Sequence, residues 1–112
     1  MSDFRKLIVW QKAMLLARLI YLFTEKLPNE ERFGLISQIR RCAVSTPSNI
    51  AEGSKRRTKK DFNQFLRIAS GSLAELETQI LLVKDIYKKE DSEVNLLLKE
   101  VQRMLESLIK KL

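Results

Sequence analysis

The stretch STPSNIAEGSKRR at positions 45–57 gathers hydroxyl, amide, carboxylate and cationic groups into a short segment. Ser45 and Ser48 are the candidate nucleophiles, but a catalytic serine needs a base beside it. The chain contains no histidine, so it offers no imidazole base and no histidine metal ligand. Its single cysteine, Cys42, cannot build a zinc site. We therefore expect no catalytic residue, no metal and no cofactor.

The sequence gives equally weak support for other kinds of catalytic site. Glu75 and Glu77 stand two residues apart in a predicted helix and point to different sides, which makes them a poor acid–base pair. With only three glycines in the chain, a glycine-rich phosphate loop cannot form. The sequence predicts a protein that is not an enzyme.

The basic run SKRRTKK at 54–60 carries five cations: Lys55, Arg56, Arg57, Lys59 and Lys60. The whole chain has a net charge of +7, which favours an anionic partner. Two of the five cations fall in the first turn of a predicted helix, where the helix dipole disfavours positive charge. A bound phosphate would make that placement favourable. We predict nucleic-acid binding, and the alternative is a run that only keeps the protein soluble.

Four helices are expected to position these groups within one domain, residues 1–112. The expected boundaries are a first helix over 4–26 with Ser2 or Asp3 as N-cap, a second after Asn29, a third opening at Thr58 with a capping-box spacing to Asp61, and a fourth opening at Asp91 or Ser92. The short connections predict an all-α, antiparallel, up-down-up-down four-helix bundle. In that topology Arg5, Lys6, Lys110 and Lys111 join the basic run at one end.

Apolar spacing in the second helix continues through Pro47. We therefore predict a helix bent at this proline, with two separate helices as the alternative. Gly53 is expected to end the helix as a C-cap. Asn49 and Glu52 are expected to cap or bridge around Gly53, as structural rather than chemical groups.

Arg40 and Arg41 of the same helix are further candidate nucleic-acid contacts, and Arg41 lies on the polar face of that helix. The alternative for Arg41 is an ion pair with Glu75 or Glu77 between helices or subunits.

The first helix is too apolar for a single buried face, since fifteen of the 23 residues from Phe4 to Lys26 are hydrophobic. One stripe comprises Leu7, Trp10, Met14 and Tyr21, and an opposite stripe comprises Val9, Leu16 and Phe23. A helix that is apolar all round is buried all round, which in a small chain implies a second subunit. We predict a homo-oligomer whose interface contains Val9, Leu16 and Phe23, with Ile68 and Leu82 from the third helix.

Cysteine usage and hydropathy bear on the compartment. A lone cysteine fits a reducing environment, and the apolar stretches AMLLA and LIYLF are too short to span a bilayer. The cytoplasm is the expected location, without a membrane partner.

Three segments carry a family resemblance: VWQKA at 9–13, FGLISQIRRCAVSTPSNIAEG at 33–53 and FNQFLRIASGSLAELETQ at 62–79. They resemble the four-helix bundle proteins called 23S rRNA intervening-sequence proteins or S23 ribosomal proteins. That family includes the accessory variability determinants of diversity-generating retroelements. The resemblance implies a ring-like, pentameric homo-oligomer with a basic surface for RNA, DNA or a reverse transcriptase. The expected function is RNA binding without catalysis, and the alternative is a protein-interaction adaptor, for example for a reverse transcriptase.

Overall fold

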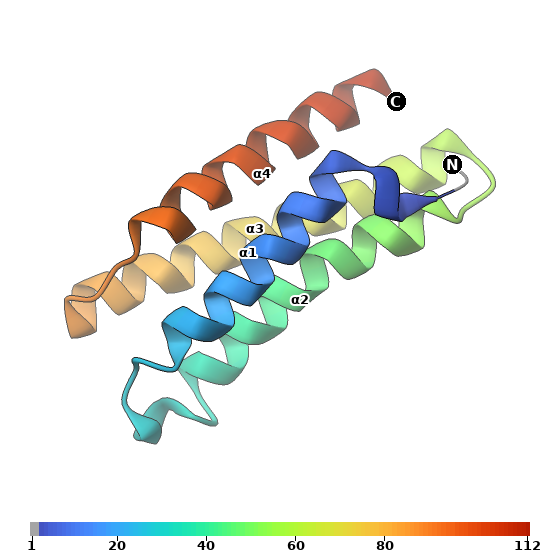
Figure 1. Cartoon of the computed structure of the whole chain (residues 1–112). Coiled ribbons are helices and arrows are strands. Elements are labelled where there is room, and N and C mark those ends of the chain that lie inside the picture. The colour runs from blue at the N-terminus through green and yellow to red at the C-terminus, as the bar shows by residue number, and fades with distance from the viewer. Residues whose placement is uncertain (1–2) are drawn as a thin grey trace.

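The structure, a computed structural model, describes residues 3–112. All regular secondary structure in this range is helical: α1 (Ile8–Thr24), α2 (Leu35–Ser54), α3 (Lys59–Tyr87), α4 (Ser92–Lys111) and two short 3-10 helices, η1 (Phe4–Lys6) and η2 (Asn29–Glu31). Successive α-helices run in opposite directions along one long axis (Figure 1). The predicted all-α, up-down-up-down four-helix bundle is confirmed.

The core follows the apolar stripes predicted for the second, third and fourth helices. Fully buried members include Ile39, Ala43 and Ile50 of α2, Leu66, Leu73 and Leu76 of α3, and Val94, Val101 and Leu105 of α4. These positions recur at steps of three, four or seven residues, so each helix turns one apolar face inward.

The two apolar stripes of α1 have the reverse of the predicted orientation. Val9, Leu16 and Phe23 are buried in the protomer's own core, with at most 5% of each side chain exposed, whereas Met14 and Tyr21 are 46% and 41% exposed. The prediction that Val9, Leu16 and Phe23 form the oligomer interface is therefore wrong. Both stripes have helical spacing, and the choice between them is made by where α2 and α4 pack.

The second helix runs through Pro47 without a break. Proline withdraws the backbone donor that would reach the carbonyl of Ala43. Side chains supply donors to the carbonyls on either side of it: Thr46 Oγ1 donates to Cys42 O (3.2 Å), Ser48 Oγ to Val44 O (2.8 Å) and Asn49 Nδ2 to Ser45 O (2.8 Å). The STPSN sequence thus keeps a proline inside a helix, as predicted.

Gly53 is not the predicted C-cap. It lies inside α2 and is buried, and the helix continues to Ser54 with Lys55 as its C-cap. A Cβ on Gly53 would lie 2.5 Å from Cβ of Phe65. The residue is needed for close approach of α2 to α3, because any side chain would collide with that helix.

The predicted caps hold at two helix starts. Thr58 Oγ1 accepts from Asp61 N (3.1 Å), and Asp91 Oδ1 accepts from Val94 N (3.1 Å). Asp3 caps only η1, because Leu7 is extended and separates η1 from α1. Ser2, the other proposed cap, lies outside the described residues. The second α-helix also begins later than expected, at Leu35, after η2.

The hydropathy of the helices bears on membrane insertion. Within residues 3–112, every helix is too short or too polar to serve as a membrane span.

Candidate nucleic-acid interface

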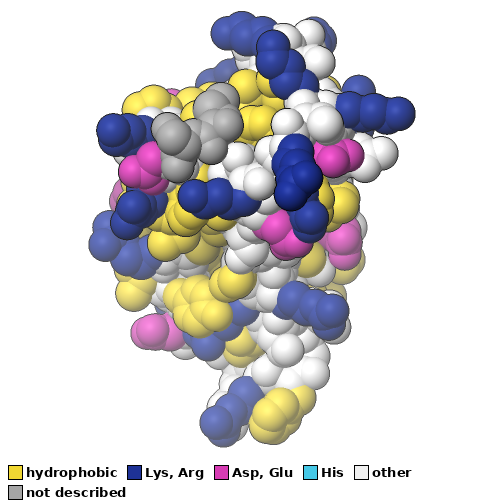
Figure 2. Space-filling model, turned by 90° about the vertical axis from the view of Figure 1, so that its right-hand side faces the viewer, with side chains coloured by type: hydrophobic (Ala, Val, Ile, Leu, Met, Phe, Trp, Pro, Cys, Tyr) yellow, Lys and Arg dark blue, Asp and Glu magenta, His cyan; other side chains and the backbone are white. Residues whose placement is uncertain are grey.

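Nine basic side chains meet at one end of the bundle. In Figure 1 the N-terminal segment, the loop between α2 and α3 and the end of α4 lie toward the same end. We call this surface the cationic end; its members are Arg5, Lys6, Lys55, Arg56, Arg57, Lys59, Lys60, Lys110 and Lys111, all of them exposed. Figure 2, viewed from this side, shows Lys and Arg side chains around hydrophobic and uncharged surface, with acidic groups interspersed among them. The predicted convergence is confirmed.

Contacts between distant segments hold the cationic end together. Asn63 Nδ2 at the start of α3 donates to Ile109 O near the end of α4 (2.9 Å). Lys55 Nζ lies 5.9 Å from the centroid of the Phe4 ring. A cavity of about 330 Å³ lies between the α2–α3 loop and the C-terminal residue Leu112. The three segments therefore form one surface.

Acidic neighbours engage only part of the positive charge. Arg5 Nε pairs with Asp3 (3.1 Å), and Arg56 Nη2 pairs with Glu52 (2.9 Å). The hydrogen bond from Arg5 lowers the pKa of Asp3, so this carboxyl stays charged. The guanidinium of Arg56 also lies over the Phe65 ring, 4.6 Å from its centroid.

Three of the loop cations lack an acidic partner among the residues that the structure describes. Across residues 3–112, Arg57, Lys59 and Lys60 take part in none of the ion pairs. Lys59 and Lys60 are the first two residues of α3, where the helix dipole disfavours positive charge. This arrangement suits contact with an anion.

Arg40 and Arg41 are not part of the cationic end. Arg40 Nε donates to Thr24 Oγ1 (2.9 Å), its Nη2 donates to Tyr21 O (3.3 Å), and its guanidinium covers the Tyr21 ring at 4.4 Å. Fourteen helical positions separate it from Ser54, the last residue of α2, which is roughly 21 Å along the axis. Arg40 therefore ties α2 to the end of α1, away from the cationic end, and its contact with nucleic acid stays a prediction.

Arg41 is exposed at the same level of the helix. Its suggested partner Glu77 instead pairs with Lys99 of α4 (3.6 Å).

The polar groups of the 45–53 stretch take part in the contact between α2 and α3. Ser45 Oγ and Ser72 Oγ share a hydrogen bond (2.9 Å) between α2 and α3, and Asn49 Nδ2 donates to the same Ser45 hydroxyl (3.0 Å). Asn49 therefore does not cap Gly53 as predicted. Glu52 does reach past Gly53, through its ion pair with Arg56 in the loop.

Cys42 is placed as a structural thiol. Gln79 Nε2 donates to its sulfur (3.5 Å), and the Cys42 Sγ–H is directed at Glu75 Oε2 (3.9 Å). Burial raises the pKa of this thiol, so it stays protonated and unreactive at neutral pH. In the described range, acidic and cysteine side chains form no group of three that could hold a metal ion.

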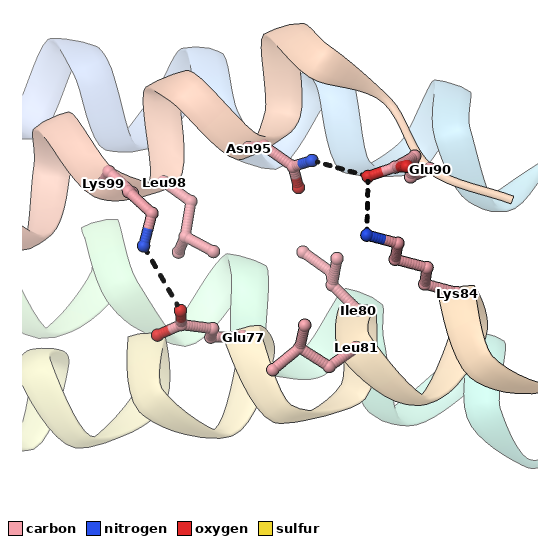
Figure 3. Close-up of a pocket in the computed structure, with 8 residues that line it drawn as sticks. All are labelled: Glu77, Ile80, Leu81, Lys84, Glu90, Asn95, Leu98 and Lys99. Carbon is pink, nitrogen blue, oxygen red and sulfur yellow. Dashed lines mark hydrogen bonds and ion pairs between the residues drawn. The ribbon is translucent and has the colours of Figure 1, made fainter.

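A second cavity lies between α3 and α4, away from the cationic end (Figure 3). It measures about 190 Å³ and has an apolar wall of Ile80, Leu81 and Leu98. Its polar groups pair across it: Lys99 with Glu77 (3.6 Å), Lys84 with Glu90 (3.6 Å), and Asn95 with Glu90 (3.3 Å). These pairs join α3 to α4 and to the loop before α4. The cavity therefore belongs to the structural contact between these two helices.

Sequence reasoning did not anticipate the aromatic rings beside the cations. Phe4 and Trp10 pack edge to face, with centroids 5.2 Å apart, and Phe65 lies under Arg56. The only sequence signal was aromatic residues near basic ones, which does not reveal contacts across helices.

Comparison with known proteins identifies the family. No curated protein matches the sequence. A family model described as 23S rRNA-intervening sequence protein matches residues 5–110. The match covers α1, α2, α3, all but the last residue of α4, and the loop between α2 and α3. The chain belongs to the 23S rRNA-intervening sequence protein family.

Proposed function

We propose that this protein binds nucleic acid, RNA in particular, through its cationic end, as a homo-oligomer and without catalysis. The observation that carries the proposal is the convergence of nine exposed cations from three separate segments. Phosphate contacts of Lys and Arg supply most non-specific affinity for nucleic acids. The expected binding therefore has weak sequence preference.

Salt dependence tests this proposal most directly. The test variant replaces Arg57, Lys59 and Lys60 with serine, because these three loop cations lack ion pairs. The logarithm of affinity falls linearly with the logarithm of salt, with a slope of about −0.7 to −0.9 per phosphate contact. Removing three contacts should flatten the slope by about 2 to 3.

A matched control removes the same charge elsewhere. The substitutions Lys26→Ser, Arg32→Ser and Lys89→Ser affect exposed cations outside the cationic end. They should lower affinity only slightly and leave the salt slope nearly unchanged, since long-range attraction is screened. Equal effects of the two triple variants would mean that binding follows net charge alone, and the cationic end would lose its assigned role.

Assembly is proposed to use the exposed face of α3. Ile68, Leu82 and Ile86 are 52%, 44% and 56% exposed and repeat with helical spacing along one side of that helix. A Cβ on Gly71, which lies between them in the sequence, would meet nothing within 4 Å. Leu82 and Ile86 are one helical turn apart, and exposed apolar patches are typical of interaction sites. The family resemblance adds the expectation of a ring of five copies.

Light scattering tests the assembly. The wild-type particle should have several times the 13.1 kDa chain mass, and the pair of substitutions Ile68→Glu and Leu82→Glu should reduce it. Leu96→Glu is the control, because Leu96 is 73% exposed on α4 rather than α3. A monomeric wild type would overturn the assembly proposal.

The same apolar face supports a second candidate function, that of an adaptor that docks another protein such as a reverse transcriptase. Binding through that face would depend little on salt, whereas phosphate contacts weaken steeply with it. The Ile68 and Leu82 substitutions would then remove partner binding, and the triple serine variant would not.

A further inference from the structure

An apolar groove between α1 and α2 extends from the cationic end. It measures about 460 Å³, within the size range of about 300–1,000 Å³ common for ligand sites. Its lining includes Phe4, Trp10, Met14 and Tyr21 on the N-terminal side and Val44 and Pro47 on α2. Trp10 and Tyr21 are eleven positions apart, so the groove follows α1 for roughly 16 Å.

Aromatic rings and cations alternate along this groove. Phe4 and Trp10 are both half-buried and pack edge to face. The ammonium of Lys55, from the basic loop, lies 5.9 Å from the centroid of Phe4. Farther along, Arg18 is exposed at the groove. Positive charge therefore stands at the mouth of the groove and again along its length.

We propose that this groove accepts unpaired bases of single-stranded RNA whose phosphates lie on the cationic end, an inference that rests on the proposed function. Proteins that bind single strands combine a basic track with aromatic side chains on which bases stack. A duplex keeps its base faces stacked inside, so it can reach the cations but not the rings. The groove thereby names the substrate class: RNA with unpaired nucleotides.

The experiment uses Trp10 itself as the reporter, since it is the only tryptophan in the chain. The full-length protein is titrated with a single-stranded oligouridylate and with a duplex RNA of the same length at the same salt. Stacking should quench Trp10 emission with the single strand and leave it unchanged with the duplex. The single strand should also bind more tightly.

Variants separate stacking from charge. Trp10→Leu and Phe4→Leu should each weaken single-strand binding roughly 5- to 100-fold and leave duplex affinity unchanged. Phe33→Leu is the matched control, because Phe33 is 89% exposed and follows η2, far from the groove in the chain. Far-UV circular dichroism verifies that each variant is folded.

The outcomes divide cleanly. Equal affinity for both RNAs without quenching overturns the stacking groove and leaves the proposed function standing. Failure to bind either RNA removes both. A Trp10→Leu protein of lower mass in light scattering would show that a second copy covers the groove, and this also overturns the inference.

Discussion

A methyl group at Gly53 would collide with α3, which makes this residue a sharp test of how closely α2 and α3 pack. Its Cβ would lie 2.5 Å from Cβ of Phe65 and 3.0 Å from Cδ1 of Phe62. The Phe65 Cβ is bonded to the α3 backbone, so it cannot move away unless the helix shifts. We expect Gly53→Ala to destabilise the fold, although alanine is the better helix former.

The magnitude follows from two opposing terms. Overpacking a close contact costs about 1–3 kcal/mol, and a clash of this depth belongs at the upper end. Replacing glycine by alanine inside a helix returns about 1 kcal/mol. The free energy of unfolding should therefore fall by about 2 kcal/mol, which corresponds to a Tm lower by about 8 °C.

Gly71→Ala is the matched control within α3. A Cβ there meets nothing within 4 Å in the same protomer, so within the protomer only the helix preference of alanine acts. This variant should gain about 1 kcal/mol in free energy of unfolding and about 4 °C in Tm.

Urea unfolding followed by far-UV circular dichroism measures both variants, at one protein concentration because assembly also adds stability. The two substitutions should change stability in opposite directions. A Gly53→Ala protein as stable as Gly71→Ala would refute the close packing of α2 against α3.

Three further predictions address other parts of the molecule. Pro47→Ala should raise the free energy of unfolding by about 1 kcal/mol in the same assay, because the gain of about 3 kcal/mol in helix preference exceeds the loss of about 1.6 kcal/mol from two buried methylenes; a clear loss would mean that packing requires the proline ring. Leu16→Ala should cost about 2–5 kcal/mol, whereas Leu82→Ala on α3 should change protomer stability by less than about 0.5 kcal/mol; a cost at Leu16 as small as that at Leu82 would contradict the assigned orientation of α1. The hydrogen bond between Tyr87 and Glu31 raises the pKa of Tyr87 from 10.0 to about 12. On a rise in pH the unfolded chain loses the Tyr87 proton before the folded chain does, so stability should fall as the pH rises from 10 toward 12. Tyr87→Phe should remove that part of the pH dependence of the urea midpoint.

Much of the candidate site was accessible from the sequence because its signals are local. The cations of the 54–60 run are adjacent in the chain, and the Thr58 cap marks the helix start that follows them. Once four helices with short connections were predicted, antiparallel packing brought Arg5, Lys6, Lys110 and Lys111 to the same end. The contacts of Arg40 could not be predicted in this way, because its partners, Thr24 and Tyr21, belong to a neighbouring helix.

Gly53 is a second residue whose role depends on a neighbouring helix and could not be predicted from local signals. Glycine near the end of a helical pattern commonly marks a C-cap, and the sequence contains no sign of another use. The structure places Phe65 of α3 against its Cα, and this contact is a property of two helices rather than one.

By itself, the sequence determined the helices, their order and the charge at one end, because periodicity, caps and basic runs act over a few residues. Only the tertiary structure decided which face of α1 is buried. Its stripes of Val9, Leu16 and Phe23 and of Trp10, Met14 and Tyr21 are both apolar, so the pattern holds no contrast that points one inward. Packing against α2 and α4 buries the first stripe and leaves the second partly exposed in the groove between α1 and α2. The reason is that a helix that is apolar all round can be oriented only by its neighbours.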